Sequence, residues 1–184
     1  MDKFESSQSC TAEPNSHFRL MSFMYQFRDF FVPRKNILKE VGIKEGFHVL
    51  DYGCGPGSYI APLADLVGPS GKIYALDIHP LAIQMVKKRA ARRKLTNVET
   101  IQSNCQTGLP DQSVDVALLY DVFHDLDQPG KVLKELHKIL KPNRILSFSD
   151  HHLKEAEIIS GVTKGDLFKL AHKGQKTYSF QKIG

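Results

Sequence analysis

The chain has 184 residues, which suits one compact domain, and 41% of them are hydrophobic, as in an ordinary globular protein. The net charge of +5 is too small to indicate a nucleic-acid partner by itself. The three cysteines are widely spaced and form no CxxC motif, which argues against a disulfide framework or a zinc knuckle and favours a reducing cytoplasm.

The N-terminal residues divide into a polar and an amphipathic segment. Residues 1–16 are polar, which predicts a flexible tail, and they lack the apolar core of a signal peptide. In residues 17–31 apolar side chains recur at helical spacing, and Pro33 is expected to end that helix. Charged residues interrupt the stretch 18–32, which excludes a transmembrane span there. We therefore expect residues 17–42 to form a helical cap.

Segments typical of strands and of helices alternate from residue 47 onward. Strands are expected at 47–52, 72–77, 98–103, 114–121 and 144–150, and helices at 35–41, 58–67, 80–94, 131–140 and 155–161. Residues 166–173 and 176–183 predict an antiparallel pair around Gly174. Because helices that separate strands make crossover connections, the first five strands are expected to be parallel. The sequence thus predicts an α/β fold, a doubly wound and mostly parallel sheet in one domain of residues 43–184.

The helix expected at 80–94 has an apolar side and a basic side. Leu81, Met85, Val86 and Ala90 are expected on its buried face. Its basic residues are Lys87, Lys88, Arg89, Arg92, Arg93 and Lys94. Such a run most simply forms the solvated face of a helix, and a surface for nucleic acid or an acidic membrane is the less favoured alternative.

Residues 49–59, VLDYGCGPGSY, place a glycine loop between a strand and a helix, which is typical of a nucleotide site. The glycines are Gly53, Gly55 and Gly57, so the third comes too early for a dinucleotide fingerprint, and no Walker lysine follows. Asp51 precedes the loop. Its negative charge would oppose a pyrophosphate but suits a ligand that carries an ammonium group and a sulfonium.

Asp77 ends the second expected strand, at the position where doubly wound folds bind ribose hydroxyls. Asp51 and Asp77 together therefore suit a nucleoside that bears an amino acid through a sulfonium, which is S-adenosylmethionine. Four segments carry a family resemblance: VLDYGCGPGSY, YALDIHP, SNCQTGLPDQSVDVALLYDVFHDL and LKELHKILKPNRILSFSD. The stretch 47–150 resembles the class I, seven-strand, Rossmann-like S-adenosylmethionine-dependent methyltransferases of the small-molecule type.

The resemblance implies roles for the loop residues. Gly53, Gly55 and Gly57, with Cys54 as a small packing residue among them, would shape the loop under the methionine part of the cofactor. Asp51 would support the loop and the ammonium group.

It also implies contacts to the rest of the cofactor. Asp77 would bind the ribose hydroxyls, and Ile78 would pack on the adenine. The family often has Asp-Ala after the third strand, where this chain has Asn104 and Cys105, and either could meet the adenine amino group. Tyr120 would border the methionine carboxylate and the transferred methyl group.

Acids and histidines follow the fourth and fifth expected strands. They are Asp121, His124 and Asp125, and then Asp150, His151 and His152. Methyl transfer from a sulfonium is a direct displacement that needs a base only if the acceptor arrives protonated. His124 and His151 are the predicted catalytic residues. A divalent metal and a purely structural role are the alternatives, and we expect no metal.

The acceptor is predicted to be a small molecule. The sequence Tyr120-Asp121-Val122-Phe123 departs from the Asn/Asp-Pro-Pro-aromatic motif of nucleic-acid amino methyltransferases. Met21 and Tyr25, with Met24 and Phe27, are expected to line a substrate pocket under a lid formed by the helix 18–31. The alternative is that this helix packs on the sheet or forms a dimer contact.

The sequence thus predicts a cytoplasmic methyltransferase that converts S-adenosylmethionine to S-adenosylhomocysteine, as a monomer or homodimer, without nucleic-acid partner or membrane insertion. The alternatives are a non-catalytic S-adenosylmethionine-binding protein and an RNA or protein methyltransferase. A nicotinamide dehydrogenase is disfavoured by the glycine spacing.

Overall fold

A computed structural model of the chain describes Ser16, Phe18 and residues 34–184. Apart from Ser16 and Phe18, the predicted tail and lid helix lie outside the described residues, as do the pocket residues Met21 and Tyr25, and they stay predictions. Among the described residues, no helix combines the length and hydropathy needed to cross a membrane.

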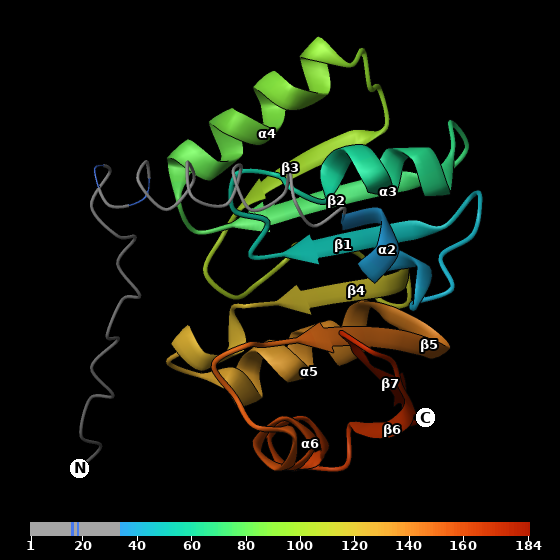
Figure 1. Cartoon of the computed structure of the whole chain (residues 1–184), viewed down its shortest axis with the longest axis vertical. Helices are drawn as coiled ribbons and strands as arrows, with labels where there is room; N and C mark the ends of the chain where they lie inside the picture. Colours follow the sequence, from blue (N-terminus) through green and yellow to red (C-terminus); the bar gives the residue numbers. More distant parts are fainter. Residues whose placement is uncertain (1–15, 17, 19–33) are drawn as a thin grey trace.

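Seven strands form one sheet in the described part of the chain, in the order β3-β2-β1-β4-β5-β7-β6 (Figure 1). They are β1 His48–Tyr52, β2 Lys72–Asp77, β3 Val98–Gln102, β4 Val114–Tyr120, β5 Leu140–Ser149, β6 Phe168–Lys173 and β7 Tyr178–Lys182. The pairs among β1 to β5 are parallel, and β7 is antiparallel to both β5 and β6. The predicted α/β fold with an antiparallel C-terminal pair is confirmed.

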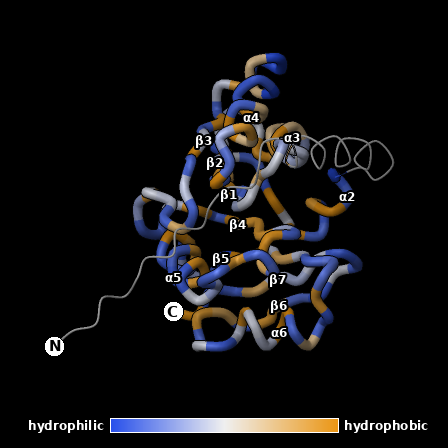
Figure 2. The backbone as a smooth tube through the Cα atoms, turned by 90° about the vertical axis from the view of Figure 1, so that its left-hand side faces the viewer, coloured by the Kyte–Doolittle hydropathy of each residue, from blue (hydrophilic) through white to orange (hydrophobic). Residues whose placement is uncertain are grey.

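Helices cover both faces of the sheet. They are α2 Arg34–Lys39, α3 Ile60–Val67, α4 Pro80–Arg92, α5 Pro129–Ile139 and α6 Glu155–Thr163. One buried cluster joins Val49 and Leu118 to α2, α3 and α4, and a second joins Leu50 and Leu119 to α5 and α6. Successive strand residues thus face opposite cores, as expected for a sheet buried on both sides. Figure 2 shows the resulting hydrophobic centre.

Two elements differ from the sequence prediction. β5 begins at Leu140, not at residue 144, because its first residue pairs with Val114 and a register shift follows before Val116. In α4 the buried residues include Ala82 and Ile83, whereas Leu81 and Met85 are only half-buried. Apolar spacing fixed the existence of that helix but not its rotation against β2 and β3.

The parallel strands bring their carboxyl ends to one edge of the sheet. β1 ends at Tyr52, β2 at Asp77, β4 at Tyr120 and β5 at Ser149, each just before a stretch that carries predicted site residues. Open α/β sheets bind ligands beyond this edge. The fold therefore gathers residues that lie up to about a hundred positions apart in the chain.

Candidate functional site

The glycine loop after β1 uses conformations that few other residues adopt. Gly53, Gly55 and Gly57 have φ angles of 74°, 50° and 81°. A Cβ atom on Gly53 would lie 2.3 Å from Val122 Cγ2, whereas a Cβ on Gly55 would meet no described atom within 4 Å. Gly53 is thus required by packing inside the fold, and Gly55 leaves open space on its outer side.

A pocket opens beside this loop. It is lined by Asp51, Gly53, Cys54, Gly55, Pro56, Ser58, Tyr59, Tyr120 and Asp121. The predicted cofactor residues outside this lining are Gly57, Asp77, Ile78, Asn104 and Cys105. The pocket therefore brings together the residues predicted around the methionine part except Gly57, and the residues predicted around the ribose and adenine lie outside its lining.

Asp51 is the most unusual polar group of the pocket. The residue is 2% exposed, and its Oδ2 has no hydrogen-bond partner among the described residues. Burial, assisted by the charge of Asp77, raises the pKa of Asp51 to about 7. A buried carboxylate oxygen without a donor is costly, so this pocket suits a ligand that brings a cation and a donor.

Asp77 holds the glycine loop against β2. Its Oδ2 accepts a hydrogen bond from the Gly55 backbone N–H at 2.8 Å, and its Oδ1 accepts one from the His79 N–H at 2.8 Å. Burial raises the pKa of this carboxyl, and the two backbone donors partly offset that effect. The sequence prediction assigned Asp77 to the ribose alone and missed this structural contact.

The residues predicted around the adenine lie after β2 and β3. Ile78 is half-buried and Asn104 is exposed, and the Asn104 carbonyl accepts a hydrogen bond from the Tyr52 hydroxyl at 3.2 Å. The Cys105 N–H donates to Ser103 Oγ at 3.4 Å, and burial, followed by the charge of Glu135, raises the pKa of its thiol. Neither Asn104 nor Cys105 is distinguished by this geometry as the adenine contact.

Aromatic side chains form one wall of the pocket. The Tyr59 and Tyr120 rings meet edge to face with centroids 5.1 Å apart, and the Tyr120 hydroxyl lies 2.7 Å from Ser147 Oγ. Burial raises the pKa of Tyr120 well above its usual value, so its phenol stays protonated. The Arg34 guanidinium lies over Tyr59 at 5.5 Å from the ring centroid. Sequence reasoning missed Tyr59, although it stands inside the glycine motif.

Cys54 lies within the loop as a buried side chain, 5% exposed. Burial, and then the charges of Asp51 and Asp77, raise the pKa of its thiol well above the usual range. A neutral thiol is a poor nucleophile, which agrees with its expected role as a packing residue.

Two histidine–aspartate pairs cross between the loops that follow β4 and β5. His124 Nδ1 lies 2.9 Å from Asp150 Oδ2, and His151 Nδ1 lies 2.8 Å from Asp121 Oδ1. Each aspartate also accepts the backbone N–H of its histidine at 3.2 Å. The His152 ring lies between the other two, with centroid distances of 4.1 Å to His124 and 3.9 Å to His151.

The convergence of these side chains was expected, but their crossed pairing and the position of His152 were not. Within the described residues, no group of three or more His, Cys, Asp or Glu has an arrangement that could hold a metal ion.

Phe18 reaches the loop that follows β2. Its ring stacks on His79 with centroids 4.1 Å apart and an interplanar angle of 13°, and both side chains are buried. His79 in turn accepts the Leu81 N–H at 3.1 Å and caps α4. An N-terminal residue thus contacts the residue that lies two positions after Asp77.

Comparison with known proteins gives a consistent picture. Residues 43–182 match a family described as a methyltransferase domain. The demethylmenaquinone methyltransferase of Geobacillus stearothermophilus is 30% identical over 132 residues, 71% of this chain and 56% of that protein. The corresponding protein of Lactococcus lactis subsp. lactis is 28% identical over 75% of this chain and 56% of its own. The chain thus spans about half the length of these relatives.

Solved structures share this fold. A SAM-dependent methyltransferase from Aquifex aeolicus is 25% identical, with a TM-score of 0.79 over 93% of this chain and 98% of that one. An arsenic (III) S-adenosylmethionine methyltransferase from Chlamydomonas reinhardtii is 22% identical, with a TM-score of 0.63 over 78% of this chain and 65% of that one. The second likeness shows the fold alone.

Proposed function

Because the chain belongs to the methyltransferase domain family and has the class I, seven-strand architecture of the S-adenosylmethionine-dependent enzymes, we propose that it methylates a small-molecule acceptor. The methyl donor is S-adenosylmethionine, bound at the glycine loop, and the product is S-adenosylhomocysteine. The relatives in Geobacillus and Lactococcus are named for a small-molecule acceptor, demethylmenaquinone, which supports this substrate class over RNA or protein.

The observation that carries the proposal is the unpartnered Asp51 oxygen beside the open side of Gly55. Asp51 would accept the ammonium group of the methionine part, which supplies both the missing donor and a compensating positive charge. Gly55 would let the ligand approach the backbone at a point where any side chain would intrude. Both features suit this cofactor.

The remaining cofactor contacts are proposed from position. Asp77 would accept the ribose hydroxyls through carboxylate lone pairs that its two backbone donors leave unused. Ile78 would pack on the adenine, with Asn104 or Cys105 at the amino group. Tyr120 would border the methionine carboxylate.

S-adenosylmethionine supplies a methyl group on a sulfonium, whose leaving group is neutral. The protein's contribution is therefore mainly to align the acceptor and to exclude water. Tyr59 and Tyr120 form a rigid wall for that alignment, because their rings are packed against each other. His151 pairs with Asp121 of the pocket lining, and the His152 ring separates it from His124.

The N-terminal residues 17–42 are proposed to cap the site, with Met21 and Tyr25 toward the acceptor. The contact between Phe18 and His79 supports a cap that reaches the ribose end. A cytoplasmic location, a monomeric or homodimeric state and the absence of a nucleic-acid partner complete the proposal.

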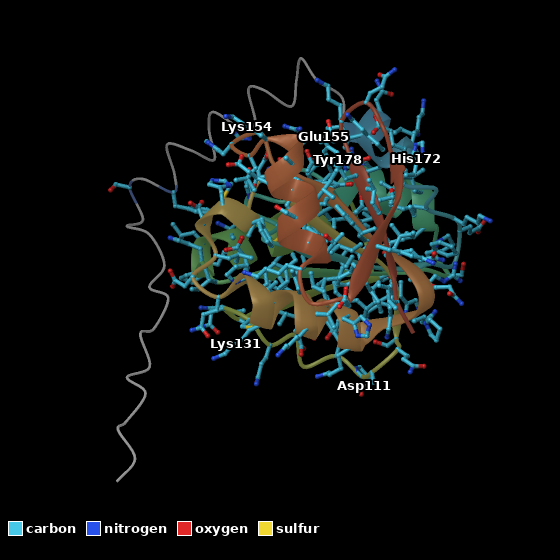
Figure 3. The ribbon with its side chains drawn as sticks, turned by 90° about the horizontal axis from the view of Figure 1, so that it is seen from below. Asp111, Lys131, Lys154, Glu155, His172 and Tyr178 are labelled. Atoms are coloured by element: carbon cyan, nitrogen blue, oxygen red, sulfur yellow. The ribbon has the colours of Figure 1, made fainter. Side chains whose placement is uncertain are left out.

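The test is isothermal titration of the purified protein with S-adenosylmethionine, S-adenosylhomocysteine and NAD. Micromolar binding of the two sulfur ligands and none of NAD is the expected result. Asp51→Asn and Asp77→Ala should each weaken binding. Asp111→Asn, at an exposed carboxylate near α5 (Figure 3), is the matched control and should not. Failure of both sulfur ligands to bind the wild-type protein would refute the proposed function.

A further inference from the structure

We propose that His151, held by Asp121, is the general base that removes the proton from the acceptor, and that the crossed pair of His124 and Asp150 is a structural brace. The inference rests on the proposed methyl transfer and goes beyond it, since the transfer as such needs no base. It applies to an acceptor that arrives protonated and must lose that proton to become nucleophilic, such as a quinol.

The two pairs differ in whether the imidazole keeps a ring nitrogen that can accept a proton from a ligand. The His151 side chain is 59% exposed, and its Nε2 has no hydrogen-bond partner among the described residues. The His124 side chain is 21% exposed, and its Nε2 lies 3.3 Å from Asp125 Oδ2. Both nitrogens of His124 are therefore occupied, whereas His151 keeps one nitrogen for a ligand.

The two aspartates differ in the same sense. The Asp150 side chain is fully buried, and besides both contacts from His124 it accepts the backbone N–H of His152 at 3.1 Å. Asp121 lines the pocket next to Tyr120. The His151 pair is thus the one that adjoins the proposed methyl donor.

Asp121 also holds His151 in the tautomer that a base requires. Its carboxylate accepts from Nδ1 at 2.8 Å, which places the proton on Nδ1 and the lone pair on Nε2. Asp121 has φ of 53° in the left-handed region, where residues other than glycine are uncommon, while its N–H donates to Ser149 O at 2.7 Å. Strained backbone conformations cluster at functional sites, and here the strained residue directs its carboxylate at His151.

His152 fixes the orientation of the base. Its ring is tilted by 44° to His151 and by 37° to His124 at about van der Waals distance from both. In the described structure the titratable groups that face His151 are Asp121 and His152, and beyond His152 lies His124 with its two carboxylates. His151 is therefore positioned from two loops at once.

For a quinol acceptor, the proton of a ring hydroxyl passes to His151 Nε2, and the electron-rich ring carbon of the resulting quinolate attacks the methyl carbon. That ring carbon then loses its own hydrogen as a proton to the quinolate oxygen, which restores the hydroxyl and the aromatic ring. The carbon–sulfur bond breaks with its electron pair to sulfur, which leaves a neutral thioether. The imidazolium then returns its proton to solvent through the exposed side of His151. The net products are methylated acceptor, S-adenosylhomocysteine and a proton.

The first test measures methyl transfer to a short-chain demethylmenaquinol between pH 6 and 9. For the wild-type protein we expect kcat to rise with pH and then level off, as in a reaction that needs a deprotonated base. His151→Gln should lower kcat by about 10²–10³-fold and remove this rise, with affinity for S-adenosylmethionine unchanged. Asp121→Asn should lower kcat about tenfold or more by the same route.

One further histidine variant is the matched control, and another contrasts the two histidine–aspartate pairs. His172 is an exposed residue of β6 (Figure 3), and His172→Gln should retain the wild-type kcat and pH profile. His124→Gln should keep the rise of kcat with pH even where its fold is less stable. A flat profile for His124→Gln combined with a wild-type profile for His151→Gln would overturn the assignment.

The second test needs no acceptor. Diethyl pyrocarbonate modifies neutral imidazole, and mass spectrometry gives the rate at each histidine. We expect His151 to react faster than His124, and Asp121→Asn, but not Asp111→Asn, to slow His151 several-fold. Equal rates for His151 in the wild-type protein and in Asp121→Asn would contradict the proposal.

The two proposals fail separately. Absence of S-adenosylmethionine binding would refute the proposed function whatever the histidine rates. If the protein binds this ligand but does not methylate the quinol, the acceptor is wrong, and the modification rates by themselves then support or overturn the role of Asp121 and His151.

Discussion

The glycine-loop pocket and the histidine loops after β4 and β5 lie at the same sheet edge, but their carboxylates differ in hydrogen bonding. In the pocket, Asp51 is buried with an unpartnered oxygen beside the negative charge of Asp77. In the histidine loops, Asp121 and Asp150 each accept two hydrogen bonds from a single histidine. The first region is electrostatically incomplete without a ligand, and the second is complete.

This difference indicates that the pocket binds a ligand, whereas the histidine loops position their rings. A buried carboxylate without a hydrogen-bond donor destabilises the ligand-free fold, and a cation that binds to it removes this penalty and thereby gains binding free energy. Carboxylates that histidines already satisfy instead fix the position and tautomer of the rings. Substitutions in the two regions should therefore change different quantities.

The largest expected effect is at Asp51. Its pKa rises on folding from 3.8 to about 7, so the native state holds more protons between these values and stability falls as pH rises through that window. The penalty above pH 7 is on the order of 4 kcal/mol. Asp51→Asn should therefore raise the unfolding free energy of the ligand-free protein at pH 8 more than at pH 5, and weaken S-adenosylmethionine binding about 100-fold or more. Urea titrations at both pH values and calorimetry measure the two effects, and a variant less stable at pH 8 would contradict the comparison.

The glycines should separate stability from binding inside the pocket. Gly53→Ala forces a Cβ to within 2.3 Å of Val122 Cγ2 at a positive φ, so we expect a loss of about 2–3 kcal/mol of stability. Gly55→Ala carries only the cost of its φ, about 1 kcal/mol, because its Cβ meets open space. That Cβ should instead weaken S-adenosylhomocysteine binding. Urea unfolding and titration of both variants test this, and equal losses of stability would count against the geometry.

The two histidine pairs should differ in stability by a smaller amount. Asp150→Asn removes a fully buried acceptor with three donors, so we expect a loss of about 2 kcal/mol. Asp121→Asn affects a partly exposed carboxylate and should cost less than about 1 kcal/mol. Urea midpoints of the two variants, compared with the same substitution at exposed Asp111, measure the difference. The reverse order would show that Asp121, not Asp150, is the brace.

A final prediction concerns the pH dependence of cofactor affinity. Because the Asp51 carboxyl must lose its proton to pair with the ammonium group, affinity for S-adenosylmethionine should rise about tenfold per pH unit below 7 and level off above it. The α-amino group of the ligand stays largely protonated up to about pH 7.7, so it does not mask this rise. Calorimetry from pH 5.5 to 7.5 tests the trend. A constant affinity in Asp51→Asn is the control, and the same constancy in the wild-type protein would refute the role of the carboxylate.

The sequence was sufficient wherever a local pattern decides the structure. Short apolar runs predicted the strands and period-3.6 spacing predicted the helices from β1 onward, and their alternation predicted that the first five strands are parallel. The glycines of the loop and the acid that precedes them predicted the pocket, because a strand, a tight turn and a helix N-terminus are neighbours in the chain.

Only the tertiary structure decided what depends on distances between segments. The early start of β5 follows from its pairing with β4, and the buried face of α4 follows from its rotation on the sheet. Asp121, Asp150 and the three histidines could be placed at one edge from the strand ends, but nothing local dictates that the pairs cross or that His152 lies between the rings. Those contacts span about thirty residues, and they are set by the packing of two loops rather than by the sequence of either one.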